Sequence, residues 1–139
     1  MKMNLYGHKV NQLARLFSKK LNEKISPFGL YTSQYGIVTY LYKKKQCTQV
    51  ELSKYLCVEP PTITRTLTRM EQMGWIVRKE GKDRRERYLT LTEKAYEMFP
   101  KWNEAVSNVE ITALKDINKE ELDIFNNILE KMMTNLEED

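Results

Sequence analysis

The stretch from Pro61 to Leu91 constrains the fold of this chain most, because an amphipathic helix pattern is followed at once by a hairpin pattern. In residues 61–72 the apolar side chains recur at about 100° per residue and form a single stripe. That stripe consists of Ile63, Leu67 and Met70. Residues 75–78 and 88–91 are strand-like and flank a turn at residues 81–85. A helix that leads directly into a short β-ribbon predicts a winged helix-turn-helix.

The side of this helix opposite the apolar stripe is polar and carries two arginines without an acidic residue. It holds Pro61, Thr62, Arg65, Thr68, Arg69 and Gln72, with Thr64 beside them. An arginine can donate two hydrogen bonds to the N7 and O6 atoms of guanine, and threonine or glutamine can bond base edges or phosphates. The threonines, arginines and glutamine are therefore candidate contacts to the major groove of duplex DNA. The alternative is an ordinary amphipathic helix whose polar side faces solvent.

The turn of the hairpin is basic as well. Its candidate DNA contacts are Lys82, Asp83, Arg84, Arg85 and Arg87. An arginine on a thin ribbon can enter the narrow minor groove, where the negative potential of DNA is concentrated. Asp83 suits an anchor within the loop that pairs with a neighbouring arginine and fixes the shape of the ribbon. The alternative is a solvated, charged turn.

Helical patterns fill most of the remaining chain, so the predicted fold is mostly α with a small β-hairpin wing. A first helix is expected over about residues 4–25. A second is expected to run through Lys44 with Thr32 as its N-cap, and the capping-box sequence of Thr48 and Glu51 opens a third.

Two long helices are expected after the hairpin. The first, capped by Thr92, runs from about residue 93 to 114 and contains Pro100, at which we expect a kink or a break. The second is opened by the capping box of Asn118 and Glu121. Both have wide apolar faces, which indicates that the helices over about 4–25 and 93–137 form a dimerisation platform. An intramolecular bundle is the alternative.

The net charge of +4 is unevenly distributed along the chain. Residues 1–59 carry +7, residues 60–92 carry +4 and residues 93–139 carry −7. A basic surface joined to an acidic end is typical of a protein that offers one face to a polyanion. The alternative is a solvated surface on which the charges are dispersed.

Several classes of protein are disfavoured by the sequence. It has no run of about 18 apolar residues and no signal peptide at its start, which predicts a cytoplasmic protein without a membrane contact. Its two cysteines, Cys47 and Cys57, and its one histidine, His8, have no metal-ligand spacing. Neither a glycine-rich phosphate loop nor a nucleophile elbow is present. We therefore predict no enzyme activity, no catalytic residue, no metal and no cofactor.

The chain resembles the MarR family of bacterial transcription regulators over nearly its whole length. The similarity rests on residues 29–41 and 52–94, within which it includes Leu52-Ser53, Thr62-Ile63-Thr64-Arg65, Met70-Glu71, Gly74-Trp75-Ile76, Asp83-Arg84-Arg85 and Leu91-Thr92. The resemblance implies a single domain over residues 1–139, with a DNA-binding lobe over about 32–92. It also implies a homodimer that binds a pseudo-palindromic operator. Arg85 would then enter the minor groove, and Asp83 would stabilise the wing.

The same resemblance suggests a small aromatic effector, because many members of the family release DNA when a phenolic molecule binds. The candidate pocket residues are His8, Phe17, Tyr31 and Tyr35, which are alternatively core or dimer-interface aromatics. Some members sense oxidants through a cysteine in the first helix, but this chain has none there. Cys57 lies in the turn before the arginine-bearing helix, so a redox role for it is a separate hypothesis.

The sequence therefore predicts a sequence-specific DNA-binding transcriptional regulator, a ligand-responsive repressor that acts as a homodimer. Two other functions stay open. The first is a winged-helix module whose basic face binds an acidic protein or the acidic end of its own chain. The second is an effector-binding sensor that does not contact DNA.

Overall fold

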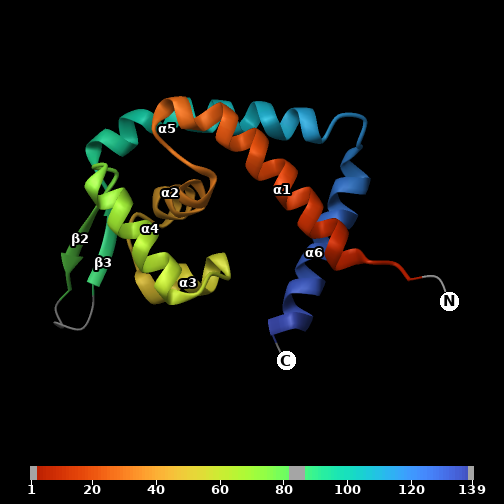
Figure 1. Ribbon diagram of the computed structural model, residues 1–139, viewed down its shortest axis with the longest axis horizontal. Helices are drawn as coiled ribbons and strands as arrows, with labels where there is room; N and C mark the ends of the chain where they lie inside the picture. Colours follow the sequence, from red (N-terminus) through yellow and green to blue (C-terminus); the bar gives the residue numbers. More distant parts are fainter. Residues whose placement is uncertain (1–2, 82–86, 138–139) are drawn as a thin grey trace. The chain divides into compact units, whose positions relative to one another are not determined.

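A computed structural model of the protein describes residues 3–81 and 87–137. The chain divides into two compact units, Met1–Val109 and Glu110–Asp139. The first contains α1 (Tyr6–Ile25), a 3-10 turn (Ser26–Phe28), α2 (Thr32–Lys44), β1 (Cys47–Thr48), α3 (Gln49–Leu56), α4 (Pro60–Gln72), β2 (Ile76–Glu80), β3 (Arg87–Leu91) and most of α5 (Glu93–Ala113). The second contains the end of α5 and α6 (Lys119–Glu137) (Figure 1). The mostly helical fold with a small hairpin confirms the prediction.

The core of the first unit is built from both helices and strands. Its largest fully buried side chains are Ile25, Leu30, Ile37, Val38, Leu41, Cys47, Leu52, Leu67, Met70, Ile76, Leu89 and Trp102. A Cβ atom at Gly36 would lie 2.9 Å from Cδ2 of Leu56, so glycine lets α2 approach α3 closely. Burial of each large aliphatic side chain contributes about 1.5–3 kcal/mol. The α3–α4 pair is therefore fixed by packing on α2.

Two tryptophans attach the turn after α1 to this core. The indole Nε1 of Trp75 donates a hydrogen bond to the carbonyl of Gly29 (3.1 Å), and that of Trp102 donates to the carbonyl of Phe28 (2.9 Å). The two rings meet edge to face with centroids 4.8 Å apart. Both indole donors are thus satisfied, which removes the main cost of burying tryptophan.

The sheet has three antiparallel strands in the order β1-β3-β2. The hairpin pairs Arg78 with Leu89 and Glu80 with Arg87, so each strand extends further toward the turn than the predicted residues 75–78 and 88–91. The third strand, β1, was not predicted, because two residues are too few to show an alternating pattern. It pairs Cys47 with Leu89 and anchors the start of α3 beside the wing.

The end of α4 is a glycine turn that leads directly into the wing. Gly74 has a φ of 82°, in the left-handed region that favours glycine. Its N–H donates to the carbonyl of Glu71 (3.1 Å), and the N–H of Trp75 donates to the carbonyl of Met70 (2.9 Å). This pair of bonds is a Schellman motif, which ends helices at glycine. It fixes the direction in which β2 leaves α4.

Thr92 connects the end of β3 to the same turn and to the start of α5. Its hydroxyl donates a hydrogen bond to the carbonyl of Gly74 (2.6 Å) and accepts one from the N–H of Ala95 (3.2 Å). Its own N–H donates to the carbonyl of Trp75 (3.1 Å). The predicted cap of this helix is therefore confirmed, and it also closes the base of the wing.

One local prediction is wrong, and a second is wrong in part. Thr32 is the first residue of α2 and Tyr31 is its N-cap, because the N–H of Thr32 is satisfied by Oδ1 of Asn22 on α1 (2.8 Å). Of the kink or break expected at Pro100, the break is absent, since α5 is one helix from Glu93 to Ala113; the kink stays a prediction. Buried residues lie on both sides of this proline, Ala95 before it and Trp102 after it, so burial favours a continuous helix.

The second unit is capped as predicted. The side chain of Asn118 accepts from the N–H of Glu121 (2.8 Å), and the side chain of Glu121 accepts from the N–H of Asn118 (3.1 Å). The helix that follows, α6, has no buried residue among those described. Its apolar side chains include Ile124, Phe125, Ile128, Met133 and Leu136, all exposed.

Candidate nucleic-acid interface

The outward side of α4 is the centre of the candidate interface. Its core stripe is buried as predicted, with Ile63, Leu67 and Met70 each at most 2% exposed. The candidate contacts on this helix, all of them exposed, are Thr62, Thr64, Arg65, Thr68, Arg69 and Gln72. The helix therefore separates a hydrophobic side from a polar side that holds both of its arginines.

The N-terminal part of this side is already ordered by its own contacts. An Nη atom of Arg65 donates a hydrogen bond to the hydroxyl oxygen of Thr62 (3.3 Å), three residues earlier on α4. The guanidinium keeps further donors, so it can still donate to a base. The contact limits the rotamers of Arg65, which lowers the entropy lost when it binds.

Gln49 is a part of the candidate interface that was not predicted from the sequence. It is the first residue of α3, and its Nε2 donates to the hydroxyl oxygen of Thr64 on α4 (2.6 Å). The helix it starts is capped by Thr48, whose hydroxyl oxygen accepts from the N–H of Glu51 (3.1 Å), as predicted. Thr64 therefore links α4 to α3, in addition to being a candidate contact to a base.

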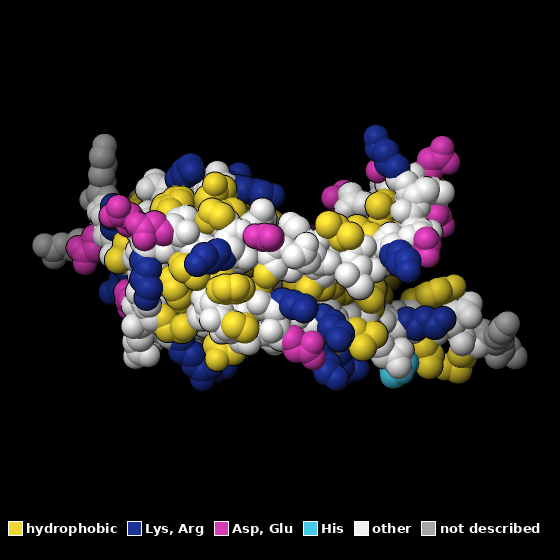
Figure 2. All heavy atoms as spheres, turned by 90° about the horizontal axis from the view of Figure 1, so that it is seen from above, with side chains coloured by type: hydrophobic (Ala, Val, Ile, Leu, Met, Phe, Trp, Pro, Cys, Tyr) yellow, Lys and Arg dark blue, Asp and Glu magenta, His cyan; other side chains and the backbone are white. Residues whose placement is uncertain are grey.

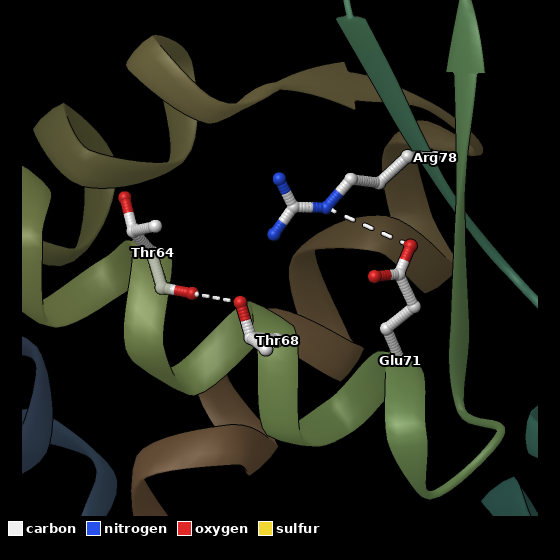
Figure 3. Close-up of polar contacts among 4 residues, drawn as sticks. All are labelled: Thr64, Thr68, Glu71 and Arg78. Atoms are coloured by element: carbon white, nitrogen blue, oxygen red, sulfur yellow. Dashed lines mark hydrogen bonds and ion pairs between the residues drawn. The ribbon is translucent and has the colours of Figure 1, made fainter.

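The wing lies beside α4, and an ion pair joins the two (Figure 3). Nε of Arg78 on β2 lies 3.7 Å from Oε2 of Glu71 on α4. This distance is too long for a hydrogen bond, and within the described part of the chain the buried Nε has no hydrogen-bond partner. The carboxylate is 44% exposed, so the pair stabilises the fold by only about 0–1 kcal/mol. Its consequence is orientation, because it directs the guanidinium toward α4. This pair was not predicted from the sequence.

Of the predicted wing contacts, only Arg87 is among the residues that the structure describes. It is exposed at the start of β3, in register with Glu80 on β2. The others, Lys82, Asp83, Arg84 and Arg85, lie outside the described residues. In the sequence they lie between Glu80 and Arg87, the last paired residues of the hairpin.

The four effector-pocket candidates lie on two elements of the first unit. His8 is exposed and Phe17 half-buried on α1, nine residues apart, which places them about 180° apart around the helix. One protomer therefore does not bring these two side chains to one side of α1. Tyr31 is exposed at the N-cap of α2, and Tyr35, one turn later, packs partly against the core.

The two cysteines differ in their surroundings. Cys47 is buried, and burial, with a smaller effect from Glu51, raises the pKa of its thiol to about 12. Because the thiolate is the reactive form, this shift makes Cys47 inert near neutral pH. Cys57 is exposed at the C-cap of α3, with a φ of 55°.

The geometry of an exposed arginine-bearing helix beside a hairpin also occurs in known proteins. The sequence pattern of the MarR family matches residues 30–86, which include α2, α3, α4 and β2. The chain is 40% identical over 121 residues to YwoH of Bacillus subtilis (strain 168), an uncharacterized HTH-type transcriptional regulator, and this covers 87% of the chain and 88% of YwoH. The chain belongs to the MarR family. The resemblance seen in the sequence is thereby confirmed, and the protein is a transcriptional regulator rather than an enzyme.

Solved structures confirm the winged-helix fold of this MarR-family chain. A cysteine-to-serine mutant of MarR from E. coli, complexed with operator DNA, superimposes with a TM-score of 0.82 at 22% identity, over 94% of this chain and 99% of that one. Reduced AbfR bound to DNA gives a TM-score of 0.76 at 25% identity, over 93% of this chain and 88% of that one. None of the helices among the described residues is long and apolar enough to cross a membrane.

Proposed function

We propose that this regulator binds a pseudo-palindromic operator in the cytoplasm as a homodimer and represses transcription, with α4 in the major groove. The observation that carries the proposal is the exposed side of α4, which presents Arg65 and Arg69 on a helix with a fully buried opposite side. Both arginines have the donors that guanine N7 and O6 accept. The DNA complexes of MarR and AbfR, which share the fold, support this reading.

The wing is proposed to act in the minor groove. The antiparallel pairing of β2 and β3 continues to Glu80 and Arg87, the residues on either side of the basic segment in the sequence. Arg85 in that segment is proposed as the minor-groove contact, with Asp83 as the acid that orients it. Lys82, Arg84 and Arg87 are proposed to bind phosphates.

The proposal of a homodimer rests on apolar side chains that are exposed to solvent on α1 and, separately, on α6. In Figure 2 hydrophobic side chains lie open at the end of α1 next to the N-terminal residues. The exposed apolar residues of this region are Met3, Leu5, Tyr6, Val10, Leu13 and Leu16. Apolar surface of this extent on two helices is typical of an interface between subunits.

A small aromatic effector is proposed as a ligand of the dimer. Because His8 and Phe17 point in opposite directions from α1, a pocket that includes both draws one of them from each protomer. Phe17 would then join Tyr31 and Tyr35 of its own chain. Titration of salicylate as a probe into the DNA complex, with Tyr31→Ala as the variant, tests this part: release that the variant does not alter excludes this pocket.

The main test is selection of random duplex DNA by the purified full chain at about 0.15 M salt. We expect enrichment of a dyad whose half-sites lie about one helical turn, or a multiple of it, apart. Arg65→Ala and Arg69→Ala should each cost about 1–3 kcal/mol and relax the preference at particular bases, whereas Arg85→Ala should weaken binding to all sequences. Arg15→Ala, on α1, removes the same charge elsewhere and should leave the motif unchanged.

The same experiment separates the alternatives. Equal losses from both α4 variants at every sequence would refute base reading by the arginines. Binding that depends on salt without an enriched motif would indicate a nonspecific polyanion contact. If no DNA binds, the −7 charge of residues 93–139 favours the protein-interaction module, whose basic face meets an acidic segment.

A further inference from the structure

Three threonines on α4 donate their hydroxyl protons in hydrogen bonds to backbone carbonyls of the same helix. Thr64 donates to the carbonyl of Pro60 (3.0 Å), Thr66 to that of Thr62 (3.0 Å) and Thr68 to that of Thr64 (2.9 Å). Each bond runs to the carbonyl four residues earlier, and Figure 3 shows the bond from Thr68. A hydroxyl has a single proton, so each of these side chains presents an oxygen that accepts and a methyl group.

Only one of the three is open to a ligand on the outward side of α4. The oxygen of Thr64 already accepts from Gln49, and Thr66 is half-buried at the edge of the core stripe. Thr68 is exposed, and no side chain among residues 3–81 and 87–137 donates to its oxygen. It lies one helical turn beyond Arg65, about 60° around the helix axis from it.

The chemistry of Thr68 differs from that of its arginine neighbours. In the major groove the bases that donate are adenine, through N6, and cytosine, through N4, whereas thymine presents a methyl group at C5. Guanine presents acceptors alone, which an accepting oxygen cannot bind. An A·T pair is the pair that offers both a donor and a methyl group to one side chain.

We propose that Thr68 is a specificity-determining residue that selects an A·T pair in each half-site, with its oxygen accepting from adenine N6 and its methyl group contacting the thymine methyl. This inference rests on the proposed binding of operator DNA. Arg65 and Arg69 donate and therefore read guanine, so the two kinds of residue on one helix recognise opposite hydrogen-bond patterns.

The test uses the operator obtained by selection from random DNA. In it, the A·T pair whose enrichment depends on Thr68 is replaced in turn by two base analogues, each of which lacks one chemical group. Uracil in place of thymine removes only the C5 methyl, and purine in place of adenine removes only the N6 amino group. For the unaltered chain we expect the first change to weaken binding about fourfold, the value for one buried methyl group. We expect the second to weaken it roughly two- to tenfold, the value for one hydrogen bond.

Two variants of Thr68 divide these effects. Thr68→Val keeps a methyl group and loses the acceptor, so its binding should still respond to uracil and no longer to purine. Thr68→Ser keeps the acceptor and its bond to the backbone, so its binding should respond to purine and no longer to uracil. The effect of purine on base pairing itself is common to all proteins tested, and it cancels in the comparison.

Thr66→Val and Thr66→Ser are the matched controls, because Thr66 makes the same backbone bond on the half-buried side of α4. These variants should enrich the same motif as the unaltered chain, and both base substitutions should weaken their binding as much as they weaken that of the unaltered chain. A motif that is enriched by the unaltered chain and identical for both Thr68 variants would overturn this inference and leave the proposed function standing. Absence of any enriched motif would instead overturn the proposed function. Thr68→Ser retains the hydroxyl, so the comparison holds even if the valine variant is unstable.

Discussion

Removal of the Thr92 hydroxyl is expected to destabilise the protein by about 2 kcal/mol. The hydroxyl makes two bonds, one from the N–H of Ala95 at the start of α5 and one to the carbonyl of Gly74 after α4. Loss of a threonine N-cap costs about 1 kcal/mol. Loss of a hydrogen bond that leaves a part-buried carbonyl without its partner costs about 1 kcal/mol more. Thr92→Val keeps the branched shape, so the packing loss is small.

The measurement is urea unfolding followed by tryptophan fluorescence, at one protein concentration because subunit association contributes to apparent stability. Trp75 and Trp102 are suitable reporters, since both side chains are buried in the folded chain and become exposed on unfolding. Thr92→Ser keeps both hydroxyl bonds and should stay within about 0.5 kcal/mol of the unaltered chain. Thr66→Val is the control for loss of a hydroxyl that bonds only within its own helix. Equal destabilisation by the serine and valine variants would refute the reasoning, because it would locate the effect in packing rather than in the two bonds.

Two further predictions follow from burial. Leu67→Ala should lower the free energy of unfolding by about 2–5 kcal/mol, because Leu67 is fully buried on the inner side of α4. Val77→Ala, at an exposed position, is its control. A loss below about 1 kcal/mol in urea unfolding would contradict the assignment of Leu67 to the core. At about pH 8 iodoacetamide should alkylate Cys57 and spare Cys47, whose pKa is raised from 9.0 to about 12, so that few of its thiols are ionised. Mass spectrometry of the folded chain reads this out, and equal labelling of both cysteines would show that Cys47 is accessible.

The features predicted correctly from the sequence are those set by neighbouring residues. The spacing of Ile63, Leu67 and Met70 determines which side of α4 is buried, whatever the rest of the chain does. The caps of α3 and α6 involve residues three apart, which a sequence displays directly. For the same reason the outward side of α4 could be predicted before the structure was known.

The features that were missed depend on how separate elements meet. Gln49 and Thr64 are fifteen residues apart and come together only through the packing of α3 on α4. The N–H of Thr32 is satisfied by Asn22 of another helix, so the preference of threonine for N-caps was overridden by a tertiary contact. The hydroxyl bonds of the threonines likewise depend on their rotamers, which the sequence does not specify.

The two proposed DNA contacts are coupled through a small set of backbone bonds. The wing leaves α4 through Gly74, and Thr92 returns the chain to that same residue after β3. The direction of the hairpin relative to α4 is thus fixed at its base by the two hydrogen bonds that Thr92 donates, to the carbonyls of Gly74 and Trp75. The ion pair of Glu71 and Arg78 joins the hairpin to α4 further from this base. Because an offset at the base of a ribbon grows toward its tip, loss of the Thr92 hydroxyl should displace the wing more than loss of this partly exposed ion pair. We therefore expect Thr92→Val to weaken DNA binding more than Glu71→Gln does, in proportion to the loss of the minor-groove contact.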